Sequence, residues 1–199
     1  MLKQNIEDAK NSLRRFDFPQ DVIIETTAFC NLRCIMCPQK DMKRTKGNME
    51  FDVFKNIIDE VVTKSNETRI WLAIMGEPLL LGKRLIDFLS YVRLNRLGSY
   101  LNTNGLLMDR AMADSIIEQE PKEILIGIDA IRSETYSKIR VGGCYDTVKN
   151  NVLYLLSRKP NKTKVIVQFI EMDENSSETE PFKEYWLSEG AVVKIRPRL

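Results

Sequence analysis

The chain has 199 residues, of which 43% are hydrophobic and 29% are charged, values typical of one folded globular domain and not of a disordered or membrane protein. Its 30 basic and 28 acidic residues leave a net charge of +2, too small to favour nucleic acid or an anionic lipid surface as a partner. Because the sequence contains no histidine, it excludes a Ser-His or Cys-His nucleophilic pair and the commonest nitrogen ligand of metals.

The first segment, residues 1–16, carries charges throughout and has no apolar run of signal-peptide length. We expect it to form a short helix outside the main fold, within an N-terminal extension of residues 1–20. The apolar runs further along the chain are too short to span a membrane. The sequence therefore predicts a cytoplasmic protein without a membrane segment, in a compartment where thiols stay reduced.

From residue 21 onward, short runs rich in aliphatic and aromatic residues alternate with segments of helical period. Hydrophobic residues at three- and four-residue steps predict helices at 51–62, 85–92 and 148–156, and weaker ones at 108–119 and 181–189. The acidic segment 171–180 predicts a solvated loop. The short runs predict six strands covered on both faces, as in parallel sheets: 21–27, 69–75, 98–104, 123–129, 164–170 and 191–195.

Six β–α units are too few for the closed eight-unit barrel, which takes about 250 residues. The pattern predicts an α/β fold: a partial, laterally open (β/α)6 barrel of the TIM type, in one domain of residues 21–199. A doubly wound open sheet is the alternative. In both architectures the functional residues gather at the C-terminal ends of the strands.

Three cysteines follow the first predicted strand with the spacing C-x3-C-x2-C: Cys30, Cys34 and Cys37. Three thiolates can hold an iron–sulfur cubane and leave one of its irons without a protein ligand. A zinc site is an alternative, but structural zinc takes four ligands and the remaining cysteine, Cys144, lies far along the chain. A disulfide is the other alternative, and a reducing compartment argues against it.

The stretch "CNLRCIMC", residues 30–37, resembles the cluster motif C-x3-C-x-Φ-C of the radical S-adenosylmethionine (radical SAM) superfamily, with Met36 at the apolar position Φ. The resemblance implies a [4Fe-4S] cluster on the three cysteines and S-adenosylmethionine bound at the fourth iron. It also implies an enzyme that cleaves S-adenosylmethionine reductively to a 5′-deoxyadenosyl radical, which abstracts hydrogen from a substrate. Such an enzyme requires a low-potential electron donor of the flavodoxin or ferredoxin type. A non-catalytic metal-binding or redox-sensing module with the same cysteines is the alternative.

Later strand ends carry further similar stretches. "MGEP" (75–78) resembles the family's GGE motif, which implies that Gly76 and Glu77 bind the amino group of S-adenosylmethionine. "LNTNG" (101–105) ends the third strand, at the position that faces the cofactor and substrate cavity in similar proteins. This position implies Asn102 and Asn104 as binding residues.

The segment 126–140 resembles a stretch of the family that usually reads "SIDG...ETYEKIR". The match implies that Asp129 lies at the site and that Arg140 binds the carboxylate of S-adenosylmethionine, a pairing suited to a planar guanidinium. Gly127 stands where the family often has a serine, so one contact to the cofactor is missing. If alternation along the fifth strand places Gln168 inward, its amide points toward the adenosine pocket; a structural role is the alternative.

The stretches "GEPLL", "SETYSKIRVGG" and "VKNNV" are most similar to members with a SPASM or twitch extension. These members include peptide maturases, sulfatase-maturing enzymes, and dehydrogenases or epimerases of sugars and aminocyclitols. The similarity implies a sugar, aminocyclitol or peptide substrate that is oxidised, epimerised or matured. The sequence holds no cysteines for an auxiliary cluster, so we expect it to be a truncated piece of such an enzyme, with a minimal core enzyme as the alternative.

Overall fold

The computed structural model describes residues 18–72 and 74–197. The helix predicted for residues 1–16 lies outside the described residues. The proposed division at residue 20 between an extension and the main domain stays a prediction. No helix among the described residues has both the length and the apolar character needed to cross a membrane.

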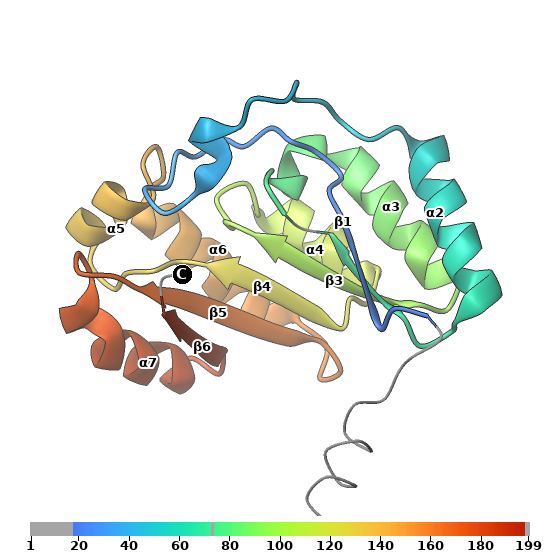
Figure 1. Cartoon of the computed structure of the whole chain (residues 1–199). Helices are drawn as coiled ribbons and strands as arrows, with labels where there is room; N and C mark the ends of the chain where they lie inside the picture. Colours follow the sequence, from blue (N-terminus) through green and yellow to red (C-terminus); the bar gives the residue numbers. More distant parts are fainter. Residues whose placement is uncertain (1–17, 73, 198–199) are drawn as a thin grey trace, which may run out of the picture.

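Six parallel strands form one sheet in the order of the chain, as Figure 1 shows. In the described part of the chain, β1 and β6 are the two edges of this sheet. The sequential order confirms the partial, laterally open (β/α)6 barrel, because a doubly wound sheet would reverse its strand order near the middle. The strands are β1 Asp21–Ile24, β2 Arg69–Leu72, β3 Gly98–Thr103, β4 Glu123–Gly127, β5 Lys164–Glu171 and β6 Val192–Pro197.

Helices follow the strands and cover the outer face of the sheet (Figure 1). All five predicted helices are present. The short helix α5 was not predicted, because its sequence SETYSKI is hydrophilic and spans only two turns. The α-helices are α2 Phe51–Lys64, α3 Lys83–Leu94, α4 Arg110–Glu118, α5 Ser133–Ile139, α6 Tyr145–Arg158 and α7 Thr179–Ser188, and the 3-10 turns are η1 Pro38–Asp41, η2 Pro78–Leu81 and η3 Ser176–Glu178.

The hydrophobic core lies between the sheet and the helices. Phe54 of α2 stacks on Phe88 of α3 with ring centroids 4.4 Å apart. Phe169 of β5 packs against Phe182 of α7 at 4.9 Å. Because side chains alternate along a strand, the neighbour of Phe169, Gln168, points to the opposite, inner face of the open barrel. The inner face is therefore free to carry polar side chains.

The first four predicted strands were slightly too long at their C-terminal ends, with β1 ending at Ile24 and β2 at Leu72, whereas β5 and β6 continue one and two residues beyond their predicted ends. The prediction of a solvated acidic loop at 171–180 was wrong for Glu178. Its side chain is buried, and it accepts hydrogen bonds from the backbone N–H groups of Ile131 and Arg132 at 2.7 and 3.1 Å. This acidic residue fixes the loop after β4.

Candidate active site

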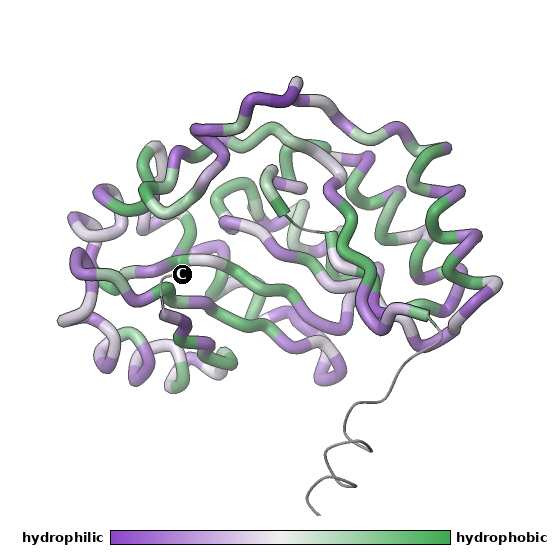
Figure 2. Tube along the Cα trace, in the orientation of Figure 1, coloured by the Kyte–Doolittle hydropathy of each residue, from purple (hydrophilic) through white to green (hydrophobic). Residues whose placement is uncertain are grey.

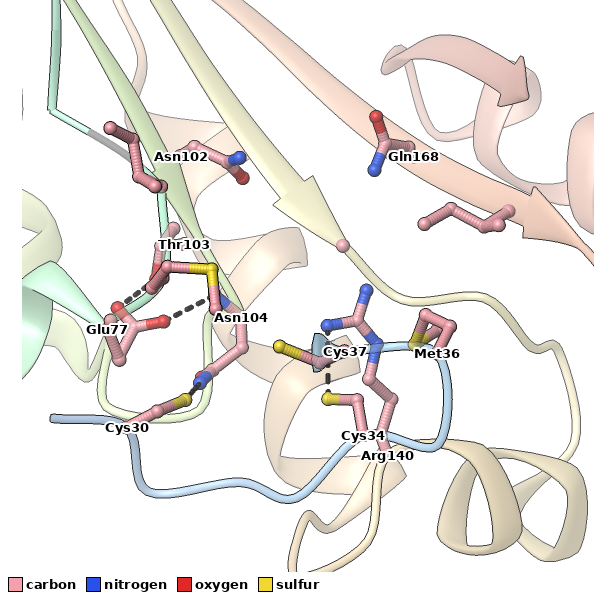
Figure 3. A pocket seen from close by; sticks show the side chains of 15 residues that line it. Cys30, Cys34, Met36, Cys37, Glu77, Asn102, Thr103, Asn104, Arg140 and Gln168 are labelled. Carbon is pink, nitrogen blue, oxygen red and sulfur yellow. Dashed lines mark hydrogen bonds between the residues drawn. The ribbon is translucent and has the colours of Figure 1, made fainter. Parts of the chain in front are cut away.

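A pocket of about 260 Å³ opens at the C-terminal ends of strands β2 to β5 (Figure 3). One wall is the segment that follows β1, residues 28–46, here called the cysteine loop. Of the eleven site residues predicted from the sequence, only Asp129 does not line this pocket. The ten that line it are Cys30, Cys34, Met36, Cys37, Gly76, Glu77, Asn102, Asn104, Arg140 and Gln168.

The cysteine loop is held by its neighbours through backbone hydrogen bonds. The N–H groups of Arg33 and Ile35 donate to the carbonyl groups of Val141 and Ile139, at 2.9 and 3.0 Å. These two bonds tie the loop to the end of α5. The N–H of Glu77 donates to the carbonyl of Phe29 at 2.8 Å, which ties the loop to the segment after β2.

Gln39 also joins the cysteine loop to the segment after β2. Sequence reasoning did not identify this residue. Its buried side-chain amide donates to the carbonyl groups of Ala28 and Met75, both at 2.9 Å. The amide of Gln39 thus pairs with two carbonyl groups of different segments at once. No sequence signal marks Gln39, because its partners are backbone atoms of segments far apart in the chain.

The three sulfurs line one pocket, and a cubane takes such cysteine ligands on separate irons. A structural zinc site would need a fourth ligand, and Cys144 does not line the pocket. Burial raises the pKa of the Cys30 and Cys34 thiols, so a bound metal must displace their protons.

Glu77 is almost fully buried, with only 2% of its surface exposed, and three hydrogen bonds fix its carboxylate, of which Figure 3 draws those from Thr103 and Asn104. Oε1 accepts from the Thr103 hydroxyl at 2.6 Å and from the Leu79 N–H at 3.1 Å, and Oε2 accepts from the Asn104 N–H at 2.7 Å. Burial raises the pKa of the Glu77 carboxyl, and these bonds oppose the rise. Since a carboxylate has about four acceptor positions, one remains for a donor in the pocket.

Gly76 lets the β2 end approach the cysteine loop. A Cβ at this position would lie 2.0 Å from the carbonyl oxygen of Thr27, so a side chain cannot be accommodated. Asn104, from the β3 end, approaches the same loop. Its amide donates to Asn31 at 2.8 Å and lies 4.0 Å from the sulfur of Cys30. The second and third strand ends are therefore packed directly onto the cysteine segment.

Two further amides, those of Asn102 and Gln168, point into the pocket from β3 and β5 (Figure 3). Neither makes a side-chain hydrogen bond to any described residue. Both amides have free donors and acceptors for a bound molecule.

Arg140 reaches the pocket from the end of α5 and is held by Asp129. Its Nε donates to Oδ2 of Asp129 at 2.7 Å, and its Nη2 lies 2.5 Å from the same oxygen. Nη1 donates to the sulfur of Cys34 at 3.6 Å. Burial acts to lower the pKa of Arg140, but the adjacent Asp129 carboxylate outweighs it and raises that pKa further, so the guanidinium stays charged.

Asp129 lies behind Arg140, is fully buried and does not line the pocket. Its Oδ1 accepts the backbone N–H of Ile170 at 2.7 Å, and its backbone has a positive φ of 62°. Gly127 leaves the room that the guanidinium fills, since a Cβ there would lie 2.2 Å from Nη2. The absence of the family's serine thus has a physical reason in this chain: a side chain at residue 127 would clash with the guanidinium of Arg140.

Cys144 is exposed and does not line the pocket. It is the N-cap residue of α6, so three cysteines remain at the site.

The model of the Radical SAM superfamily matches residues 24–178 of the chain. The tungsten-containing aldehyde ferredoxin oxidoreductase cofactor-modifying protein of Pyrococcus furiosus is 25% identical over 171 residues, which are 84% of this chain and 48% of that protein. A GTP 3′,8-cyclase of Synechocystis is 28% identical over 147 residues, 71% of this chain and 43% of the cyclase.

Among solved structures, that of Streptococcus suis SuiB bound to S-adenosylmethionine is similar in fold, with a TM-score of 0.79 at 13% identity. The match covers 98% of this chain and 45% of SuiB. The chain spans about half the length of the curated relatives and structures that it matches.

Proposed function

The chain belongs to the radical SAM superfamily, and from this membership we propose that its pocket binds a [4Fe-4S] cluster and S-adenosylmethionine and that the protein cleaves the latter reductively. These two cofactors are the ones that the superfamily uses. When bound, they supply one-electron cleavage of a carbon–sulfur bond and a carbon-centred radical that takes hydrogen from a substrate. The observation that carries the proposal is one pocket lined by three cysteine sulfurs, a buried carboxylate and a guanidinium with only 12% of its side chain exposed.

We assign the cluster to Cys30, Cys34 and Cys37. With three protein ligands, one iron stays open on the side of the pocket, where a small molecule can bind it. The hydrogen bonds of the cysteine loop to α5 and to the β2 end hold the three sulfurs in place before a cluster is loaded.

We assign the carboxylate of S-adenosylmethionine to Arg140 and its amino group to Glu77 and the backbone of Gly76. Arg140 has N–H donors left after its bonds to Asp129 and Cys34, and a planar guanidinium matches a carboxylate. Glu77 keeps an acceptor position for an ammonium group, and a charge-assisted hydrogen bond in a buried site is strong. The carboxylate and the ammonium group of S-adenosylmethionine would thus each lie beside a side chain of opposite charge.

We assign the adenosine and the substrate side to Asn102, Asn104 and Gln168, with Met36 as the apolar neighbour of the cluster. For the substrate we propose a small molecule or peptide, of the sugar, aminocyclitol or peptide classes that the sequence implies. One named relative is a cofactor-modifying protein and the other is a cyclase of GTP, so the superfamily membership itself leaves the substrate class open.

The test is anaerobic reconstitution with iron and sulfide. The protein should hold about four irons per chain and form 5′-deoxyadenosine from S-adenosylmethionine and dithionite. Cys34→Ala should lose both properties, and Cys144→Ala, which changes an exposed cysteine outside the pocket, should keep both. Zinc in place of iron, or an intact cluster in Cys34→Ala, would contradict the assignment. A stable cluster without cleavage would favour the redox-sensing module.

A further inference from the structure

The inner face of the open barrel continues from the pocket onto the edge strand β6. In β5, Gln168 and Ile170 line the pocket. Their register partners in β6 are Lys194 and Arg196, here called the β6 pair. Because paired residues of neighbouring parallel strands point to the same face of a sheet, both cations lie on the face that carries the pocket. Neighbouring strands are about 4.8 Å apart, so the β6 pair stands one strand beyond the lining residues.

Burial along β6 agrees with this direction of the two side chains. Val193 and Ile195 pack against the core between the sheet and the helices, whereas the β6 pair is exposed. Side chains alternate along a strand, so the β6 pair points to the inner face. Figure 2 shows the change from the largely hydrophobic β4 and β5 to β6, where hydrophilic residues interrupt the hydrophobic ones.

The other charged strand residues of the inner face pair with one another. Asp21 of β1 forms an ion pair with Arg69 of β2, and Glu123 of β4 forms one with Lys164 of β5. The β6 pair has neither an ion pair nor a side-chain hydrogen bond to any described residue. The described strands thus place four cations and two carboxylates on this face, and the two unpaired charges are both positive and both on β6.

Two cations that lie two residues apart on one strand suit a single anionic group. Their Cα atoms are about 6.6 Å apart, and their long side chains can converge on one anion. Arginine offers a planar fork of donors and lysine a compact charge, and both bind phosphate oxygens. A phosphate monoester carries a charge of about −1.5 to −2 near pH 7, so it matches both cations, whereas a carboxylate matches one.

The inner face between the cysteines and the β6 pair suits the neutral part of such a molecule. The amides of Asn102 and Gln168 line the pocket there and can bond to hydroxyl groups. Leu125 and Ile166 are buried and apolar, and they share this face because they alternate with residues of the core. The described strand residues in this part of the face include no carboxylate that would repel a phosphate.

We propose that the β6 pair binds a phosphate group of the substrate. The inference rests on the proposed function and narrows its substrate classes to phosphorylated sugars or aminocyclitols. The substrate then extends from the cysteine side of the pocket, across Gln168, to the edge strand, with its phosphate at Lys194 and Arg196. This step is binding alone, and no bond is made or broken in it.

The experiment titrates the full chain with methyl phosphate, the simplest phosphate monoester, at constant ionic strength and follows binding by phosphorus-31 NMR. The variant K194Q/R196Q removes both charges of the β6 pair. The variant K194R/R196K exchanges the two residue types and keeps both charges. The matched control is K64Q/K122Q, which removes two exposed lysines that precede β2 and β4.

The wild type should bind methyl phosphate with a dissociation constant on the order of 1 mM, as expected for a few charge-assisted hydrogen bonds. This constant should rise at least about tenfold in K194Q/R196Q, and stay within about twofold in the control and about threefold in K194R/R196K. Acetate, followed by carbon-13 NMR, should bind at least about tenfold more weakly than methyl phosphate. No saturable binding by the wild type, equal weakening in the control, or equal binding of acetate overturns the proposal.

Binding of methyl phosphate requires neither a cluster nor S-adenosylmethionine, so the titration separates this inference from the proposed function. If the chain binds the probe through the β6 pair but fails to cleave S-adenosylmethionine after reconstitution, the function is wrong and the phosphate site stands. If it cleaves S-adenosylmethionine while binding of the probe is indifferent to K194Q/R196Q, the function stands and the phosphorylated substrate is rejected.

Discussion

Replacing Asp129 by asparagine tests the ion pair that places Arg140 at the pocket. The Asp129 carboxylate is fully buried, and only 12% of the Arg140 side chain is exposed. Asparagine keeps the shape of the side chain, and its oxygen can still accept the N–H of Ile170. It removes the negative charge, however, and leaves a guanidinium in a buried site without its counter-ion.

Breaking one side of a buried ion pair costs about 3–5 kcal/mol, because the other charge stays buried and unpaired. Arg140 borders a pocket that admits water, so we expect the lower end, about 3 kcal/mol. For a chain of this size, 1 kcal/mol shifts the midpoint of thermal unfolding by about 2–4 °C. Asp129→Asn should therefore lower that midpoint by about 6–12 °C.

The assay is thermal unfolding followed by circular dichroism, with all variants in the same state of cluster loading. The control is Asp114→Asn, which breaks the exposed pair with Arg158 and should cost no more than about 1 kcal/mol. The double variant Asp129→Asn/Arg140→Gln removes both charges and should be less destabilised than the sum of its single variants. A loss in Asp129→Asn no larger than in the control, or simple additivity in the double variant, would refute the reasoning.

Three further predictions concern other positions of the fold. Gly76→Ala should destabilise the protein by about 3 kcal/mol in urea unfolding, because its Cβ meets a backbone oxygen at 2.0 Å, whereas Gly47→Ala, with no atom within 4 Å, should change stability by less than about 0.5 kcal/mol; equal effects would contradict the close approach. Gly127→Ser restores a hydroxyl common in the family, yet equilibrium dialysis should show at least about tenfold weaker binding of S-adenosylmethionine, because the new Cβ displaces Arg140. Unchanged binding would show that the side chain at residue 127 does not displace the guanidinium. Burial acts to raise the pKa of Glu178, but hydrogen bonds outweigh it and hold that pKa below its usual value, so the ionised Glu178 side chain stabilises the fold above about pH 4.3 and this stabilisation is lost as the pH falls further. The destabilisation by Glu178→Gln should therefore be largest at pH 7 and shrink toward pH 3. A free-energy cost that does not depend on pH would show that the charge is unimportant.

The strands and the position of the cysteine loop follow from local sequence features. Hydrophobic runs of strand length identify β1 to β6, and the rule that parallel strands place function at their C-terminal ends brings Cys30, Glu77 and Asn104 together. The ends of the strands were less well predicted: the first predicted strand ran on through the polar residues 25–27 after Ile24, and the second through the apolar residues 73–75 after Leu72.

The features that sequence reasoning missed depend on contacts between distant segments. Gln39 bonds to two backbone carbonyls, and Glu178 bonds to the loop after β4, so no local pattern distinguishes them from exposed polar residues. Asp129 was correctly expected at a strand end, but only the folded chain shows that it pairs with Arg140 and stands behind it. The same holds for Gly127, whose missing side chain makes room for that arginine.

The central claim is that three cysteines leave one iron of a cubane open for S-adenosylmethionine. Mössbauer spectroscopy of the protein reconstituted with iron-57, before and after addition of S-adenosylmethionine, measures this directly. The account predicts that about one iron in four changes its isomer shift on addition, while the cysteine-bound irons keep theirs. A spectrum that S-adenosylmethionine leaves unchanged, from a protein with a full cluster, would contradict it.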